Sequence, residues 1–457
     1  MKQPVTTVYV RTEPSQLESW AQDGLVIDHF VRPRASTLDA DFEAIYRTCG
    51  LPADPALDFV LLSSSVYVAD KKVLRRDQPD CWTRHFDLHV PVHEVGRWQS
   101  IGEVVEQTLG FLTGDVWSAR FRAAGEWPFQ PGLSLTDFSN STAVCLFSGG
   151  LDSTVGAIDL LESGKRLLLV GHYDNNHTKK DQARVFDVLS SSYGDKIVAL
   201  LQLRVRPAPQ RELQQPTLPS KTERSVRSRS IIFLALGLLA ASAISPVTEV
   251  FVPENGFTSL NVPLTPSRRG SNSTRTTHPY FVDQITAVLT HIGLVNPVRY
   301  PFSLVTKGQM IQRCRNLGVL KRVLKSTISC AHADVLRFEK KPRGNCGYCY
   351  PCIVRRAALH AAALDDPEDY AWNVCDETDL IRGGSRGKDA RAIFMALDYA
   401  RESSPTLLSL ASGGPLRRSG SELEQLRRMY ARGLGEIECL FRDKATLEVL
   451  RLAGMNS

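Results

Sequence analysis

Residues 142–164 read TAVCLFSGGLDSTVGAIDLLESG, and this stretch decides the fold class. The apolar run TAVCLF predicts a buried strand, and the segment after SGGLDS repeats its apolar residues at helical spacing. The string SGGLDS, residues 148–153, lies where the strand ends and the helix begins. A strand, a loop and a helix in this order are typical of a sheet with parallel strands.

The sequence that follows continues the same alternation. Two strand-like runs, RLLLVGHYD at 166–174 and KIVALLQLRV at 196–205, enclose a polar helical segment. An apolar segment at 231–244 and the strand-like EVFV at 249–252 come next. Strands that alternate with helices predict an α/β core with a parallel sheet. The segment 231–244 has 14 residues, too few to cross a bilayer, so we expect a buried helix and no membrane span.

The flanking sequence differs from this core and predicts three units. Residues 1–140 mix short strand-like runs with polar stretches, as expected of an amino-terminal α+β unit. Residues 141–365 hold the α/β core, and residues 366–457 are expected to form carboxy-terminal amphipathic helices. Within the core, the polar and aperiodic residues 254–280 predict a long functional loop.

The composition excludes some classes of protein. The chain has 457 residues, 43% hydrophobic and 23% charged, so it can bury a sizeable core and is not expected to be disordered. Its formal net charge of +6 suits anionic ligands such as nucleotides but does not require nucleic acid. The amino terminus lacks the apolar run of a secretory signal, which predicts a cytoplasmic protein. Structural disulfides are rare there, so the ten cysteines need another explanation.

The loop SGGLDS has the features of an anion site. Its two glycines allow the backbone to approach a ligand closely, and the helix start presents N–H groups and the positive end of its dipole. Pyrophosphate suits such a loop, and we assign Asp152 to Mg²⁺ or to the loop geometry. The alternative is an ordinary Ser/Gly turn that caps a helix. The predicted binding residues are Ser148, Gly149, Gly150, Leu151, Asp152 and Ser153.

Four cysteines near the end of the core have the spacing of a metal site. Cys346, Cys349 and Cys352 stand three apart, and Cys330 lies sixteen residues before the first of them. Four thiolates so arranged predict a tetrahedral Zn²⁺ site with no open coordination position, and hence a structural metal. An iron–sulfur or redox role and a set of buried thiols are the alternatives. The other cysteines are scattered and are expected to be small core residues.

The string SGGLDS also resembles the signature of the PP-loop ATP pyrophosphatases. That resemblance implies a Rossmann-like core of the adenine nucleotide alpha hydrolase type. It also implies cleavage of ATP between the α and β phosphates, with transfer of AMP to an oxygen of the substrate. The string is not a Walker loop, because the GxxxxGK[ST] spacing and its lysine are absent.

Together, SGGLDSTV and CGYCYPC resemble the QueC family of 7-cyano-7-deazaguanine synthases over residues 142–363. Arg229 matches the arginine of that family's Arg-Asn helix start, although serine replaces the asparagine here. Lys307, in PFSLVTKGQ, matches the lysine of a second family motif, and Thr327 with Cys330 matches the Thr-x-x-Cys that opens the zinc site. The two cations are expected to offset phosphate charge. The catalytic residues so implied are Asp152, Arg229 and Lys307.

The substrate region departs from that family. QueC enzymes carry a Pro-Asp-Cys-Arg motif near the substrate, and this chain has RTTHPY at 275–280. Its length, PENGFTSLN at 253–261 and TRTTHP resemble instead the QatC family, the QueC-like components of the Qat antiphage defence systems. That resemblance implies protein partners from the same defence system. The candidate substrate-binding residues are Glu254, Asn255, Arg275 and His278.

The implied reaction uses ATP and Mg²⁺ to adenylate the carboxylate of 7-carboxy-7-deazaguanine, a small-molecule substrate. Ammonia or an amine of a partner protein would then take the acyl group. One alternative is a PP-loop enzyme that modifies tRNA, which the basic residues between Lys321 and Arg343 suggest. Another is a non-catalytic nucleotide-binding subunit of a defence complex. The low net charge and the lack of an aromatic-interleaved basic platform argue against direct nucleic-acid binding.

Overall fold

The computed structural model describes most of the chain. The expected boundary between residues 140 and 141 lies outside the described residues, as do residues 265–274 of the expected loop. The described residues are 4–13, 24–29, 36–125, 138, 142–209, 218–264, 275–403 and 405–455.

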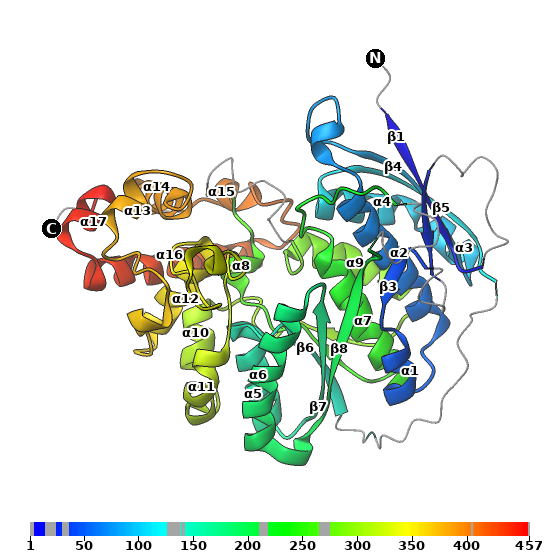
Figure 1. The fold of residues 1–457 in the computed structure, drawn as a ribbon, viewed down its shortest axis with the longest axis horizontal. Coiled ribbons are helices and arrows are strands. Elements are labelled where there is room, and N and C mark those ends of the chain that lie inside the picture. The colour runs from blue at the N-terminus through cyan, green and yellow to red at the C-terminus, as the bar shows by residue number, and fades with distance from the viewer. Residues whose placement is uncertain are drawn as a thin grey trace.

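A six-stranded sheet lies at the centre of the molecule (Figure 1). Its strands run in the order β10, β9, β6, β7, β8 and β3. The first five are parallel, and β3 pairs antiparallel with β8. The expected α/β alternation with a parallel sheet is therefore confirmed. The strand bounds are β10 (Val298–Arg299), β9 (Val250–Phe251), β6 (Thr142–Leu146), β7 (Arg166–Tyr173), β8 (Ile197–Pro207) and β3 (Leu38–Ala40).

Helices cover both faces of this sheet. Side chains of β6 alternate between the two faces, as the two-residue period of a strand requires. Val144 and Leu146 pack in the core on one face, and Ala143 and Cys145 pack in the core on the other. Burial on both faces explains why the strands are nearly continuous apolar runs. One face is covered by α1 (Glu43–Cys49), α2 (Asp54–Lys72), α7 (Arg229–Ile244) and α9 (Pro279–His291), and the other by α5 (Leu151–Glu162), α6 (Asn176–Tyr193), α10 (Lys307–Gln312) and α11 (Leu317–Val323).

Helix α7 includes the apolar segment predicted at 231–244. It is apolar on all sides because it lies between the sheet and α2, where it has no solvent-facing stripe. None of the helices in the described ranges combines the length and the hydropathy that a membrane crossing requires.

The amino-terminal unit contains a second sheet of four strands in the order β2, β1, β4 and β5. All of its pairings are parallel, whereas we expected an α+β arrangement. Parallel neighbours need long crossovers, and α3 and α4 supply the one between β4 and β5, which is the α/β pattern. The bounds are β1 (Val5–Arg11), β2 (Leu25–Asp28), β4 (His85–Val92), β5 (Val116–Ala123), α3 (Val95–Ser100) and α4 (Gly102–Thr113).

This unit shares a hydrophobic core with the central sheet. One continuous cluster of buried side chains runs from β1 and α2 to α7 and β6. Strand β3, which comes from the amino-terminal part of the sequence, also completes the edge of the central sheet. The amino-terminal unit is therefore joined to the core by packing and by strand pairing.

The carboxy-terminal helices lie at the opposite end of the long axis from the amino-terminal unit (Figure 1). Their core is formed largely by α14 and α16, which pack with α12 and α8 of the central unit. A helical region after residue 366 was expected. The bounds are α8 (Gly256–Ser259), α12 (Tyr350–Ala361), α13 (Thr378–Arg382), α14 (Lys388–Glu402), α15 (Leu407–Ala411), α16 (Gly420–Lys444) and α17 (Leu447–Leu452).

Candidate functional site

The SGGLDS loop follows the carboxyl end of β6, and its last three residues form the first turn of α5. Strands β7 and β8 continue the sheet on one side of β6, and β9 and β10 on the other. The strand order thus reverses beside the loop. Open α/β sheets bind ligands at the carboxyl ends of strands where the order reverses, so the topology points to this loop.

Local contacts fix the conformation of the loop. Gly149 has φ +76°, and a Cβ atom there would come within 3.1 Å of the Gln182 backbone on α6. The Ser148 hydroxyl accepts a hydrogen bond from Gly150 N at 3.2 Å and lies 3.2 Å from the Ser153 hydroxyl. A residue other than glycine at position 149 would be strained and would push the loop away from α6.

Asp152 connects the loop to two distant segments. Its Oδ1 lies 2.9 Å from the Lys307 ammonium at the start of α10. Its Oδ2 accepts a hydrogen bond from Asn255 Nδ2 at 2.6 Å. The carboxylate therefore fixes the positions of a cation and an amide, which supports the geometric role that we considered for it.

A cavity of 430 Å³ opens at this end of the sheet. The loop lines it with Ser148, Gly150, Leu151, Asp152 and Ser153. Of the other predicted residues, those that also line it are Arg229, Glu254, Lys307 and Cys330. The structure thus brings together the predicted anion loop, both predicted cations and one zinc-site cysteine.

The remaining predicted binding residues lie outside the wall of this cavity. Gly149 faces α6, and the fully buried Asn255 caps α8 while it holds Asp152. His278 is fully buried as the cap of α9, and burial lowers its pKa to about 3. Arg275 donates to the carbonyl of Phe111 at 2.6 Å. None of these four residues lines the cavity.

Glu254 lines the cavity three residues after the end of β9. It accepts a hydrogen bond from the Thr277 hydroxyl at 2.9 Å. Burial, and to a lesser extent the nearby charge of Asp152, raises the pKa of Glu254 to about 7. This carboxyl group can therefore exchange a proton near neutral pH or bind a cation.

Arg229 reaches the cavity from the first turn of α7. Its Nε donates to His172 Nδ1 at 3.3 Å, and His172 Nε2 lies 3.0 Å from the carbonyl of Val205. The proton of this imidazole is therefore on Nε2. Burial and the charge of Arg229 lower the pKa of His172 to about 4, so a neutral ring orients Arg229 near pH 7.

A buried carboxylate of the amino-terminal unit fixes the start of α7. Asp70, on α2, accepts hydrogen bonds from the hydroxyl of Ser228 at 2.6 Å and from its N–H at 3.3 Å. Arg84, which is fully buried, pairs with Asp70 at 2.7 Å and with Asp115 at 2.6 Å. Arg229 follows Ser228 directly, so the amino-terminal unit positions one cation of the cavity.

Sequence reasoning missed several residues of the site. Arg343 lines the cavity and donates to Asp181 from Nε at 2.9 Å and from Nη2 at 2.7 Å. Ser329 accepts a hydrogen bond from Leu151 N at 3.3 Å, and both Ser329 and Thr276 line the cavity. The basic stretch up to Arg343 was a signal for the arginine. No local pattern marks the other two residues.

Glu436 is a further residue that the sequence did not indicate. This carboxylate on α16 accepts hydrogen bonds from the Thr306 hydroxyl and, at 3.2 Å, from Gly308 N. Thr306 also caps α10, the helix that begins at Lys307. A carboxy-terminal helix thus positions the segment that carries the second cation of the cavity.

For the ATP cleavage that the PP-loop resemblance implies, we expect Glu436→Ala to reduce turnover on the order of 10-fold, because small displacements of a charged group reduce catalysis strongly. The reduction should lie in kcat more than in KM, and Glu436→Gln should restore part of it by retaining an acceptor. Steady-state kinetics of AMP release measures both constants. The control is Glu438→Ala on the same helix, where the carboxylate pairs with Arg442 at the surface. Equal effects of the two alanine variants would contradict a positioning role.

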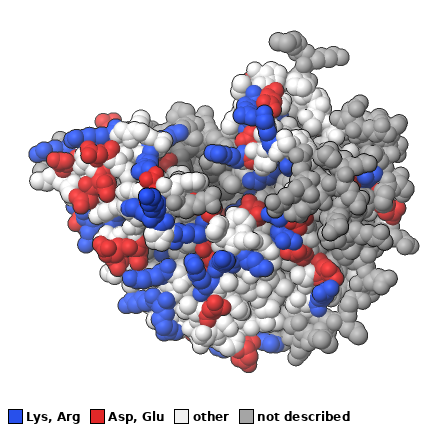
Figure 2. All heavy atoms as spheres, viewed as in Figure 1, with Lys and Arg blue, Asp and Glu red and all other residues white. Residues whose placement is uncertain are grey.

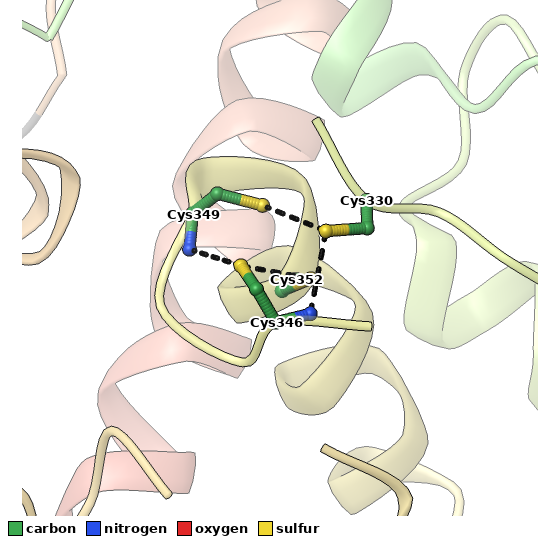
Figure 3. Close-up of side chains that lie close together, drawn as sticks. All are labelled: Cys330, Cys346, Cys349 and Cys352. Atoms are coloured by element: carbon green, nitrogen blue, oxygen red, sulfur yellow. Dashed lines mark hydrogen bonds between the residues drawn. The ribbon is translucent and has the colours of Figure 1, made fainter. Parts of the chain in front are cut away.

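The four predicted cysteines form a second candidate centre, beside the cavity. Their Sγ atoms all lie within 4.8 Å of one another, and the side chains converge (Figure 3). The Cys330–Cys349 and Cys346–Cys352 sulfur separations are 3.9 and 3.8 Å. A tetrahedral site with Zn–S of about 2.3 Å has sulfur–sulfur edges of about 3.8 Å. The cluster therefore fits a four-cysteine zinc site.

Backbone geometry supports this centre. Cys330 Sγ accepts hydrogen bonds from the N–H groups of His332 at 3.2 Å and Cys346 at 3.3 Å. Such donors stabilise thiolates and orient them toward a metal. Gly347 has φ +90°, and a Cβ atom there would lie 2.0 Å from the carbonyl of Trp372, so the tight turn requires glycine. The centre fixes the segment that carries Ser329 and Cys330 against the cavity.

Comparison with known protein families finds no family that matches this chain, and comparison with curated proteins finds no relative. The class of protein is therefore argued from the sequence and from the geometry of the site.

Proposed function

We propose that this chain is a PP-loop ATP pyrophosphatase of the QueC type, which activates a carboxylate with ATP and transfers the acyl group to an amine. One observation carries the proposal: the SGGLDS loop opens into a cavity that also contains the Lys307–Asp152 pair and Arg229. The sheet order, with the loop beside the strand where that order reverses, is compatible with a Rossmann-like core.

The cavity has the groups that adenylation requires. In the proposed reaction a substrate carboxylate oxygen attacks the α phosphorus of ATP. The bond from that phosphorus to the bridging oxygen breaks, and pyrophosphate leaves. The loop and the start of α5 would bind the phosphates, while Lys307 and Arg229 offset the charge that develops on the leaving group. An amine then attacks the acyl carbon, AMP leaves, and the amine loses a proton.

Asp152 and Glu254 would hold the Mg²⁺ that accompanies ATP. Both carboxylates line the cavity, and carboxylate oxygens are the ligands that Mg²⁺ prefers. When bound, the cation neutralises phosphate charge. A cation would also favour the ionised form of Glu254, whose pKa of about 7 leaves it partly protonated at neutral pH.

The proposed substrate is 7-carboxy-7-deazaguanine, and the proposed setting is a Qat-type defence system. Both follow from the resemblance of SGGLDSTV, CGYCYPC and PENGFTSLN to the QueC and QatC families. The accepting amine is ammonia or an amine of a partner protein from that system. The amino-terminal unit, which positions Arg229 through Ser228 and Asp70, is the part that we propose as the docking region for such a partner.

The test measures AMP and pyrophosphate release from ATP and Mg²⁺ by the full chain, with and without 7-carboxy-7-deazaguanine. We expect the carboxylate to stimulate release, and mass spectrometry of the products then identifies the group that takes the acyl. Benzoate, a carboxylate without the deazaguanine ring, is the control for substrate class. Absence of nucleotide binding and of AMP release with every substrate would contradict the proposal.

A PP-loop enzyme that modifies tRNA is the second candidate. The observation in its favour is the basic stretch from Lys321 to Arg343, whose last residue lines the cavity. AMP release that depends on added tRNA and not on the deazaguanine carboxylate would favour this candidate.

A further inference from the structure

A second cavity, of 460 Å³, lies next to the first. Arg343 and Ile328 line both cavities, so the two share a wall. The second cavity is rich in cationic side chains: Arg184, Lys325, Lys341, Arg343 and Arg355. Lys and Arg gather on the face of the molecule that carries α6, α11 and α12 (Figure 2).

Arg355, on α12, is the most unusual of these cations. It is 0% exposed, yet no carboxylate in the described part of the chain lies within 4 Å of it. Its Nη1 donates to the Thr327 hydroxyl at 2.7 Å and its Nη2 to the carbonyl of Leu324 at 3.1 Å. Its Nε has no hydrogen-bond partner among the described residues. A buried guanidinium held only by neutral groups keeps an uncompensated charge, which is costly unless an anion binds.

A second buried donor belongs to a residue that lines the same cavity. Tyr370 is 8% exposed, and its hydroxyl has no hydrogen-bond partner in the described ranges. Buried polar groups are satisfied in folded proteins with few exceptions, so two such groups in one cavity indicate a missing partner. A guanidinium Nε–H and a phenol O–H both donate, so the partner must be an acceptor.

Pairing within the chain balances only some of the other charges. Arg343 is bound to Asp181, and Lys325 lies 3.6 Å from Asp366 and 3.5 Å from Asp369. Lys341 donates to the carbonyl of Ala371 and has no carboxylate within 4 Å among the described residues.

The remaining acidic group of the wall is Glu368, which is exposed. Arg184 lies 3.8 Å from Asp181, so Arg355 and Lys341 are the cations of this wall that have no carboxylate partner among the described residues.

We propose that this second cavity binds a phosphate-type oxyanion, with Arg355 and Tyr370 as inner donors and Lys341 at the rim. The planar guanidinium and the hydroxyl match the several acceptor oxygens of phosphate. Inorganic pyrophosphate is the occupant to which we commit, because the cavity is large enough for a diphosphate and shares a wall with the cavity of the SGGLDS loop. The proposal also explains the basic stretch, since Lys325, Lys341 and Arg343 line this cavity.

Calorimetric titration of the full chain with inorganic pyrophosphate tests the proposal. The titration is run with excess adenosine 5′-(α,β-methylene)triphosphate, which would occupy the first cavity and cannot be cleaved between the α and β phosphates. With the first cavity occupied by the analogue, we expect the titration to show one pyrophosphate site, in the second cavity. Tyr370→Phe should weaken binding by roughly 10-fold, and Arg355→Gln by about 100-fold, because hydrogen bonds to charged groups are the strong ones. Lys321→Gln, at an exposed residue outside the cavity wall, should bind as the unmodified chain does.

Three results would overturn the proposal. The first is no pyrophosphate binding in the presence of the nucleotide analogue. The second is that Tyr370→Phe binds pyrophosphate as tightly as the unmodified chain while Arg355→Gln loses zinc. The buried charge of Arg355 would then stabilise the zinc centre and not a bound anion. The third is binding of short RNA, but not of pyrophosphate, that depends on Arg355. None of these measurements uses AMP release, so failure here is distinct from failure of the proposed function.

Discussion

AMP release from ATP is expected to fall by at least about 100-fold when Asp152 is replaced by asparagine. The carboxylate pairs with Lys307 at 2.9 Å and accepts from Asn255 at 2.6 Å, so it orients two groups at the mouth of the loop. Asparagine keeps the shape of the side chain but removes the charge that pairs with Lys307 and would hold Mg²⁺. Quantification of AMP by chromatography, with circular dichroism as the check of folding, measures the effect.

The control for this prediction is Asp187→Asn, an exposed carboxylate on α6 that does not line the cavity. A double variant, Asp152→Asn with Lys307→Met, tests whether the two residues act together. If they do, the double variant should be little worse than either single variant, because residues that act as a unit are strongly non-additive. Undiminished AMP release by Asp152→Asn would exclude Asp152 from the mechanism.

Replacement of Cys349 by serine is expected to remove most of the bound zinc and to lower the thermal unfolding midpoint on the order of 10 °C. A structural zinc site contributes directly to folding free energy, and loss of one thiolate of four leaves the metal weakly held. A loss of several kcal/mol in the free energy of unfolding lowers the unfolding midpoint by about that amount in a domain of this size. Zinc content by mass spectrometry and differential scanning calorimetry are the two measurements.

Two other cysteines provide controls for the zinc prediction. Cys375 is buried in the core of the carboxy-terminal helices, and Cys439 is exposed on α16. Cys375→Ser should lower the stability through the core but leave the zinc content unchanged, and Cys439→Ser should change neither. A Cys349→Ser protein that stays stable and keeps its full zinc content would refute the ligand assignment.

The parts of the molecule that could be predicted from the sequence are those whose structure depends on residues close together in the chain. Strand β6, the loop and α5 follow from an apolar run, two glycines and a helical period within one short segment. The cysteine cluster follows from the three-residue spacing of CGYCYPC, which a tight turn at Gly347 and the start of α12 bring to one point. The buried helix α7 follows from an apolar segment with no polar face.

Predictions that depended on distant contacts succeeded less well. The parallel pairing of the amino-terminal sheet and the addition of β3 to the central sheet depend on residues far apart in the sequence. Arg275 and His278, two of the predicted substrate-binding residues, are not in the wall of the first cavity: Arg275 donates to the carbonyl of Phe111, and His278 caps α9. Their segment has no hydrophobic period, so the directions of its side chains could not be predicted from the sequence.

By itself, then, the sequence determined the α/β core, the position of the SGGLDS loop and the four-cysteine cluster. Each depends on neighbours along the chain, whose spacing fixes hydrogen bonding and backbone conformation. Tertiary structure alone decided that Glu436 supports the segment of Lys307, that Asp70 supports the start of α7, and that Arg355 and Tyr370 line one cavity. The physical reason is that charge pairing and burial depend on separation in space, which packing sets even between segments 128 or 158 residues apart in the sequence.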